Sequence, residues 1–259
     1  MIVVIDVGNT HVVIGVCKGK DIVTRWRLST DVHRTEDEYC ALLRSLFQAE
    51  SLTTDAIRGV ILATVVPPML PVMQAMSEKL FGKKALVVGP GVKTGLNVKY
   101  DNPKEVGADR VVNAVAAICR YGTPLIVVDF GTATTFCYIN EKKHYLGGVI
   151  IPGVQLAAEA LFAKASKLPR TELVKPSQVI GRNTNDSLQS GLYYGGIGQV
   201  EGIVQRMMTY AGTGKKPKVI ATGGLSTLLR PDLTIADVID PDLTLKGLLD
   251  IFYMNEKLS

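Results

Sequence analysis

The sequence has few of the features that bind transition metals or cross membranes. Its four cysteines and three histidines are scattered, without the paired spacing of zinc or redox sites. No apolar run approaches the roughly 18 residues of a membrane span. The N-terminus has neither a basic start nor a small-residue cleavage site. We therefore expect reduced core thiols, no transition-metal catalysis, no membrane partner and a cytoplasmic location.

Basic charge is not concentrated in any one segment of the chain. Charged residues make up 20% of the 259 residues and the net charge is +5. A nucleic-acid-binding protein usually concentrates its basic residues in one stripe. Here the longest basic runs are pairs, namely Lys83-Lys84, Lys142-Lys143 and Lys215-Lys216. We expect no nucleic-acid partner, and a mildly positive field that suits small anionic substrates.

One segment of the sequence occurs twice. Residues 2–10 read IVVIDVGNT and residues 125–133 read LIVVDFGTA, which aligns Asp6 with Asp129 and Gly8 with Gly131. Each copy is an apolar run of buried-strand type that ends in Asp-x-Gly. Such self-similarity indicates an internal repeat.

The elements that follow each copy also match. Each copy is followed by two strands joined at hairpin length, a helix, and a further strand that ends in turn-forming residues. The predicted strands are 12–17, 22–28, 60–66, 134–139, 145–151 and 219–222, and the predicted helices begin at Thr35, with a Thr35–Glu38 capping box, and cover 154–168. We predict an α/β fold of two duplicated domains, 1–120 and 121–259, with a cleft between them.

The first candidate site is the segment Asp6–Thr10. Gly8 permits a tight turn whose N–H groups can approach an anion, and Asn9 and Thr10 add neutral donors. Asp6 would hold a magnesium ion or a water bound to it. The same residue types also make an ordinary hairpin turn.

The second candidate site is the equivalent segment, which begins at Asp129 and includes Gly131 and Thr132. Two phosphate-type turns in matching places are more specific than one. Glycine pairs at 147–148 and 223–224 would let a flat nucleotide approach the backbone. The alternative is that the neighbouring threonines are ordinary strand residues.

The third candidate, residues 100–110, has no counterpart in the repeat. Asn102, Pro103 and Glu105 are typical of a helix start, so we predict one helix from there to about Cys119. Asp109 would lie two turns into this helix, beside small residues that leave room for a ligand. Its carboxylate could accept a hydroxyl proton in phosphoryl transfer, whereas a surface salt bridge with Arg110 is the alternative.

Residues 185–211 predict a long helix capped by Thr184 or Asn185. It contains five glycines, at 191, 195, 196, 198 and 202, although each costs about 1 kcal/mol in a helix interior. Close approach of a second helix would explain them, so we predict a homodimer built on the second half. The alternatives are burial within one chain, or glycines that break the helix in two.

Together these segments resemble the type III pantothenate kinases of the acetate kinase–Hsc70–actin superfamily, whose domains are actin-like and ribonuclease H-like. DVGNT and VDFGTATT resemble the two phosphate motifs, YDNPKEVGADR the pantothenate segment, GGVIIPG the adenosine-side segment, and GRNT at 181–184 an inter-subunit substrate contact. The matches run in family order from residue 2 to about residue 224.

The resemblance implies a role for each matching residue. Asp109 would be the proton acceptor, and Asp129 would hold a monovalent cation, potassium or ammonium. Pantothenate would be bound by Tyr100, Gly107, Ala108, Asp109 and Arg110, with Thr184 reaching in from the partner subunit. The ATP phosphates would be surrounded by Asp6, Val7, Gly8, Asn9, Thr10, His11, Val12, Val13 and Thr132.

The implied activity is ATP- and magnesium-dependent phosphorylation of pantothenate to 4'-phosphopantothenate, the first step of coenzyme A biosynthesis. Two alternatives remain on the same fold. One is another small-molecule kinase, such as a sugar or acetate kinase, which would share the turns at Asp6 and Asp129. The other is a non-catalytic transcription accessory factor of the same family, which should have lost the Asp109 carboxylate.

Overall fold

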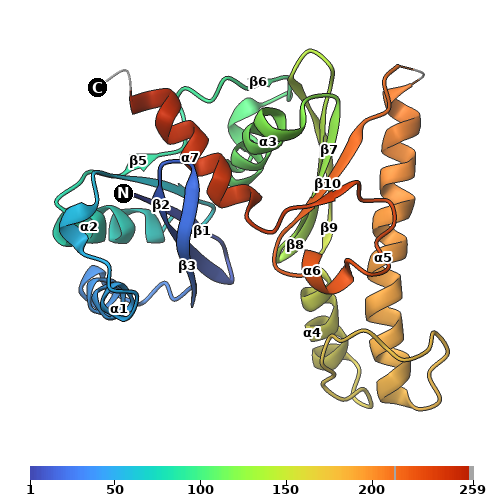
Figure 1. Ribbon diagram of the computed structural model, residues 1–259. Helices are drawn as coiled ribbons and strands as arrows, with labels where there is room; N and C mark the ends of the chain where they lie inside the picture. The colour runs from blue at the N-terminus through green and yellow to red at the C-terminus, as the bar shows by residue number, and fades with distance from the viewer. Residues whose placement is uncertain (213, 257–259) are drawn as a thin grey trace. The chain divides into compact units, whose positions relative to one another are not determined.

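The computed structural model describes residues 1–212 and 214–256. They form two compact units, each an α/β arrangement (Figure 1). Of the described residues, unit 1 comprises 1–95, 102–116 and 243–256, and unit 2 comprises 96–101, 117–212 and 214–242. The predicted α/β fold is confirmed. The division into duplicated halves at 1–120 and 121–259 remains a prediction. The compact units divide the chain differently, because the C-terminal segment from Leu243 packs with unit 1.

The sheet of unit 1 has the strand order β3-β2-β1-β4-β5. Its strands are β1 (Ile2–Val7), β2 (His11–Lys18), β3 (Asp21–Ser29), β4 (Gly59–Thr64) and β5 (Leu86–Val87). β1 pairs antiparallel with β2 and parallel with β4, and β4 pairs parallel with β5. The central strand β1 is almost completely buried, which explains its continuous apolar run.

The helices of unit 1 cover this sheet. They are α1 (Glu36–Ala49), α2 (Met69–Phe81), α3 (Ala108–Tyr121), which continues into unit 2, α7 (Leu243–Glu256), and the short 3-10 helices η1 (Thr54–Ala56) and η2 (Pro103–Glu105). α1 starts with the expected capping box between Thr35 and Glu38. Its apolar face buries Tyr39, Leu43 and Phe47 in the core of the unit.

The sheet of unit 2 has the order β11-β10-β7-β8-β9-β6. Its strands are β6 (Asn97–Val98), β7 (Leu125–Phe130), β8 (Ala133–Ile139), β9 (His144–Pro152), β10 (Lys218–Thr222) and β11 (Val238–Ile239). From β9 to β11, the order and the strand directions repeat those of β3 to β5. The duplication read from the sequence is therefore present in the sheets, with β6 added at one edge.

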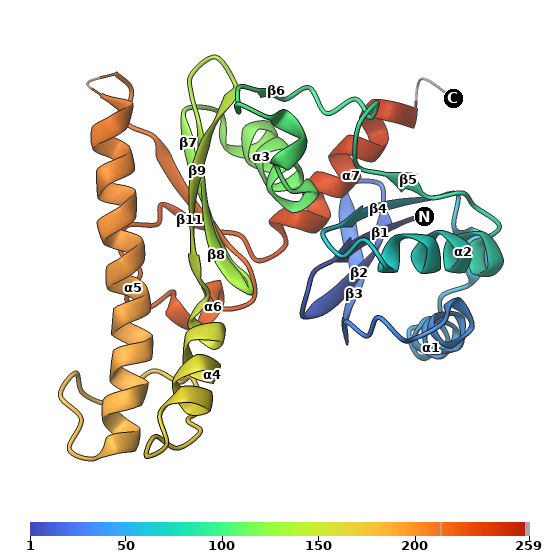
Figure 2. The same ribbon diagram turned by 180° about the vertical axis from the view of Figure 1, so that it is seen from behind.

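The helices of unit 2 are α4 (Val154–Lys164), α5 (Thr184–Ala211) and α6 (Ser226–Leu229). α5 is unbroken, so the alternative in which its glycines divide the helix is wrong. It buries Tyr193, Ile197, Val200 and Val204 against one face of the sheet. Figures 1 and 2 both show α4 lying beside the N-terminal half of α5.

Two local predictions are corrected. The helix expected from Asn102 to Cys119 is interrupted: Asn102 caps only η2, the buried Val106 is extended, and α3 begins at Ala108. Asp109 therefore lies in the first turn of α3 instead of two turns into a helix. The N-cap of α5 is Asn183, whose Oδ1 accepts a hydrogen bond from the N–H of Asp186 at 2.9 Å. In the described part of the chain, no helix is both long and apolar enough to cross a membrane.

Candidate active site

The turn after β1 is held in place by the end of β3. The N–H of Gly8 donates to the carbonyl of His11 at 2.9 Å, which closes the turn. Thr30 follows β3, and its hydroxyl donates to the carbonyl of Gly8 at 2.6 Å while its N–H donates to the carbonyl of Thr10 at 3.0 Å. These bonds fix the turn and leave Asn9 and Thr10 exposed. The backbone is thus ordered before any anion binds.

Some of the residues expected around the ATP phosphates have buried side chains that a ligand could not contact. Val7 and Val12 are completely buried in the core of unit 1, so only their backbone groups can face a ligand. Asp6 is half-buried near the end of β1. His11 is exposed, and partial desolvation and the nearby Arg27 guanidinium lower its pKa. The His11 imidazole is therefore mainly uncharged at neutral pH.

Asp109 lies at the same end of the unit 1 sheet as this turn. The N–H of Val65, just after β4, donates to the carbonyl of Val7 at 3.1 Å, so β1 and β4 end together. A Cβ at Gly107 would make an ordinary contact of 3.6 Å with Cγ1 of Val65. The same Cβ would collide with Oδ1 of Asp109. The Asp109 carboxylate therefore folds over Gly107. The carboxylate thus occupies the space that a side chain at position 107 would need.

The segment before α3 is ordered by its own polar groups. Nη2 of Arg110 donates to the carbonyl of Glu105 at 3.1 Å, and Nδ2 of Asn102 donates to Oε1 of Glu105 at 2.9 Å. Tyr100, in contrast, belongs to unit 2, where its ring lies edge-on to Tyr145 with 6.3 Å between centroids. The expected pantothenate residues are thus divided between the units.

The second phosphate-type turn is packed by two glycines of unit 2. A Cβ at Gly223, whose φ is +89°, would collide with Oδ1 of Asp129 and the backbone of Phe130. A Cβ at Gly153 would collide with the carbonyls of Gly131 and Thr132. Glycine is required at both places, because Gly223 lies against a carboxylate and backbone atoms and Gly153 lies against backbone carbonyls.

Thr222 belongs to this site, although we did not single it out from the sequence. It is the register partner of Asp129 across the parallel pair β10–β7, so both side chains lie on one face of the sheet. Thr222 is 1% exposed, and its hydroxyl has no hydrogen-bond partner among the described residues. The corresponding partner of Asp6 in unit 1 is Ala63. Aligning β10 with β4 would have revealed this difference.

Thr184 is the first residue of α5 and is exposed. The chain before it lies against the first turn of the helix, because a Cβ at Gly181 would collide with the backbone of Asp186 and Ser187. Further back, Lys175 pairs with Asp232 at 2.7 Å. Hydrogen bonds from Lys175 and Tyr193 lower the pKa of Asp232. These contacts fasten the segment between α4 and α5 to unit 2.

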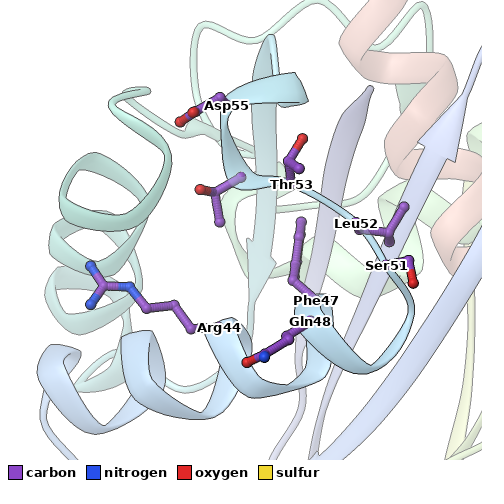
Figure 3. Close-up of a pocket in the computed structure, with 8 residues that line it drawn as sticks. Arg44, Phe47, Gln48, Ser51, Leu52, Thr53 and Asp55 are labelled. Carbon is purple, nitrogen blue, oxygen red and sulfur yellow. The ribbon is translucent and has the colours of Figure 1, made fainter.

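Other features of the described residues do not form a competing site. A surface hollow of about 530 Å³ lies at the C-terminal end of α1, between Arg44, Gln48, Thr53 and Asp55 (Figure 3). None of the residues that line it belongs to the segments above. Within 1–212 and 214–256, no cluster of three or more His, Cys, Asp or Glu side chains is placed to hold a metal ion.

A sequence model of the type III pantothenate kinase family matches residues 2–206. The chain belongs to the type III pantothenate kinase family. The residues that match the family model include both phosphate-type turns, the segment before α3, and Thr184. The match ends within α5, before β10 and α7. Family membership supports a kinase that binds nucleotide and transfers a phosphoryl group.

Solved structures share the fold of this pantothenate kinase family member. A Campylobacter jejuni protein provisionally described as a Baf family transcriptional activator is 17% identical with a TM-score of 0.62, and covers 98% of this chain and 99% of its own. The Clostridium difficile activator of 2-hydroxyisocaproyl-CoA dehydratase, solved with ADPNP, is 13% identical with a TM-score of 0.57, covering 98% and 95%.

A third solved structure comes from Sinorhizobium meliloti and is provisionally described as a 2-dehydro-3-deoxygalactonokinase. It is 11% identical with a TM-score of 0.62, covering 98% of this chain and 96% of its own. At these identities the likeness shows the actin-like fold alone. The sequence prediction of two duplicated actin-like domains is thereby confirmed.

Proposed function

We propose that this protein transfers the γ-phosphoryl group of ATP to the primary hydroxyl of pantothenate. The product would be 4'-phosphopantothenate, the first intermediate on the route to coenzyme A. The observation that carries the proposal is the place of Asp109. Its carboxylate stands at the start of α3, at the sheet end where the ordered turn at Gly8 leaves Asn9 and Thr10 exposed. A proton acceptor and a phosphate-type turn are two of the parts that phosphoryl transfer uses.

The nucleotide phosphates would be bound by the segment Asp6–Val13, through backbone N–H groups and the side chains of Asn9 and Thr10, with Thr132 from unit 2. Mg²⁺ bound with ATP would neutralise charge on the β- and γ-phosphates. Asp6 is half-buried at the end of β1 and would hold this ion through its carboxylate or a water.

Pantothenate would be bound by Tyr100, Gly107, Ala108 and Arg110, with Thr184 contributed by a partner subunit. Asp109 would accept the proton of the attacking hydroxyl as the new P–O bond forms. Its carboxylate is oriented by the absence of a side chain at Gly107, and Arg110 is held by the carbonyl of Glu105. This support makes the segment a rigid platform instead of a mobile loop.

A monovalent cation, potassium or ammonium, would bind at Asp129. The neighbouring residues fit such an ion, because the hydroxyl of Thr222 is buried beside Asp129 and has no partner among the described residues. A buried hydroxyl without a partner costs about 1–3 kcal/mol. The equivalent position in unit 1 is Ala63, so the fold itself does not require this hydroxyl. An oxygen-binding ion between these two side chains would use it.

We also propose a homodimer built on α5. Of its five glycines, Gly196 is explained within the chain, since a Cβ there would collide with Val154 of α4. Gly191, Gly195 and Gly198 have nothing within 4 Å of the Cβ position. They are spaced by four and three residues and therefore share one face of the helix. A second copy of α5 packed on this face would account for them.

The test is incubation of the purified protein with ATP, Mg²⁺, potassium and pantothenate, with glycerol, acetate and glucose as parallel acceptors. We expect phosphopantothenate alone, detected by mass spectrometry. Phosphorylation of another acceptor would give the protein a different substrate. Nucleotide binding without transfer to any acceptor would favour a non-catalytic factor.

A further inference from the structure

The C-terminal helix α7 lies outside the residues matched by the family model, yet it is fastened throughout unit 1. The hydroxyl of Tyr253 donates to the carbonyl of Gly19 at 2.8 Å. The Asn255 side chain bonds both the N–H and the carbonyl of Lys93, at 3.0 and 2.9 Å. α7 therefore contacts segments that are far apart in sequence and holds them in one unit.

Two contacts of α7 reach α3, the helix that begins with Asp109. The hydroxyl of Thr244 donates to Oδ1 of Asn113 at 2.7 Å, and Asn113 is only 2% exposed. Gly247 lies directly on the backbone of α3, because a Cβ there would come well within 3.0 Å of the carbonyl oxygen of Val112. Gly247 is itself buried in the interface.

We propose that Thr244 and Gly247 are positioning residues for Asp109. Val112 and Asn113 follow Asp109 by three and four residues, which is one helical turn, so their contacts lie on the helix face that carries the carboxylate. A helix moves nearly as a rigid rod over one turn. The distance between α7 and α3 therefore sets where the Asp109 carboxylate stands. This inference rests on the proposed role of Asp109 as proton acceptor.

The residue types at these positions agree with a positioning role. Glycine in a helix interior costs about 1 kcal/mol relative to alanine, so Gly247 needs a compensating reason, which close contact with α3 supplies. The Thr244–Asn113 hydrogen bond joins one defined point of α7 to one defined point of α3. Apolar contacts between two helices allow sliding and rotation, whereas one buried polar pair fixes the register.

The first variant is Gly247→Ala. The new methyl meets backbone that cannot rotate away, so α3 must shift by roughly 1 Å. A misplacement of about 1 Å can cost on the order of 10²-fold in rate. We expect kcat to fall by roughly 10- to 100-fold with little change in the KM for ATP. Thr244→Val should lower kcat by about 10-fold, and Thr244→Ser, which retains the hydroxyl, should restore it.

The matched control is Gly59→Ala. A Cβ at Gly59 would also collide with α7, but with the end of the Phe252 ring. This variant perturbs the same helix without touching α3. We expect it to change thermal stability more than kcat. An equal loss of kcat in the two variants, at equal loss of stability, would mean that α7 acts only through the stability of the unit.

The decisive measurement is a double-mutant cycle with Asp109→Asn. If Gly247→Ala acts by displacing the carboxylate, it should change the residual kcat of Asp109→Asn by less than about twofold. A full additional loss in that background would overturn the proposal.

The same variants separate this inference from the proposed function. If the wild type phosphorylates a different acceptor, the cycle is run on that acceptor. If it phosphorylates none, the proposed function fails, and hydrogen exchange still tests the contact. Amides of residues 108–116 must then exchange faster in Gly247→Ala than in Gly59→Ala, and equal exchange would overturn the proposal.

Discussion

Replacing Gly107 by alanine should separate activity from stability. A Cβ at this position would collide with Oδ1 of Asp109 but would lie at an ordinary 3.6 Å from Val65. Gly107 is not among the glycines with a left-handed backbone, so alanine can adopt its conformation. The only group that must move is the Asp109 carboxylate, which is the free end of a side chain.

The expected magnitudes follow from this geometry. The carboxylate must retreat by roughly 0.5–1 Å, and a displacement of that size can cost about 10²-fold in rate. Removing the base costs about 10²–10⁴-fold, which sets an upper limit. Stability should be unchanged or slightly higher, because glycine-to-alanine changes without strain stabilise by about 0.4–1 kcal/mol through the unfolded state.

The assay is steady-state phosphorylation of pantothenate with thermal unfolding of the same samples. Gly89→Ala is the matched control, since Gly89 is also in unit 1 and has nothing within 4 Å of its Cβ position. We expect the two variants to unfold at similar temperatures and to differ in kcat by roughly 30- to 100-fold. Wild-type kcat in Gly107→Ala would show that the position of the carboxylate does not limit the reaction.

The remaining predictions concern the base, the cation and the assembly. Asp109→Asn should fold normally and lose about 10²–10⁴-fold in turnover; near-normal turnover would remove its assigned role. Activity should require potassium or ammonium, and Thr222→Val should raise the potassium concentration needed for half-activation by about 10-fold, the equivalent of one hydrogen bond to an ion. Full activity in sodium alone would contradict the cation site, and unchanged potassium activation would remove Thr222 from it. Gly195→Leu should give an inactive, folded monomer in light scattering, because the new side chain would occupy the face on which the second copy of α5 packs. A fully active wild-type monomer at micromolar concentration would exclude the shared site.

The duplicated sheets could be predicted because their signals are local. Buried strands that end in Asp-x-Gly and hairpin turns of matching length occur at corresponding places in both halves. The structure places Asp6 and Asp129 at the fifth position of β1 and β7, as the alignment requires. Burial on both faces of a central strand leaves a continuous apolar run that sequence reasoning can find.

The interrupted helix before α3 could not be predicted from local signals. Asn102, Pro103 and Glu105 are suitable for the start of either a short 3-10 turn or a long helix. Burial of Val106 and the folding of the Asp109 carboxylate over Gly107 decide between them, and both depend on tertiary contacts. The place of α7 was missed for the same reason, because its contact with Val112 leaves no pattern in either segment.

The return of α7 to unit 1 has a consequence for how the protein is made. Residues 117–242 make up most of unit 2 and are synthesised before the last segment of unit 1. At roughly 5–20 residues per second, a ribosome needs about 6–25 s to add them. During that time the strands of unit 1 exist without the helix that covers Gly15 and Gly59, and their apolar surface remains open. The nascent chain should therefore be a substrate for chaperones that bind apolar segments until α7 emerges.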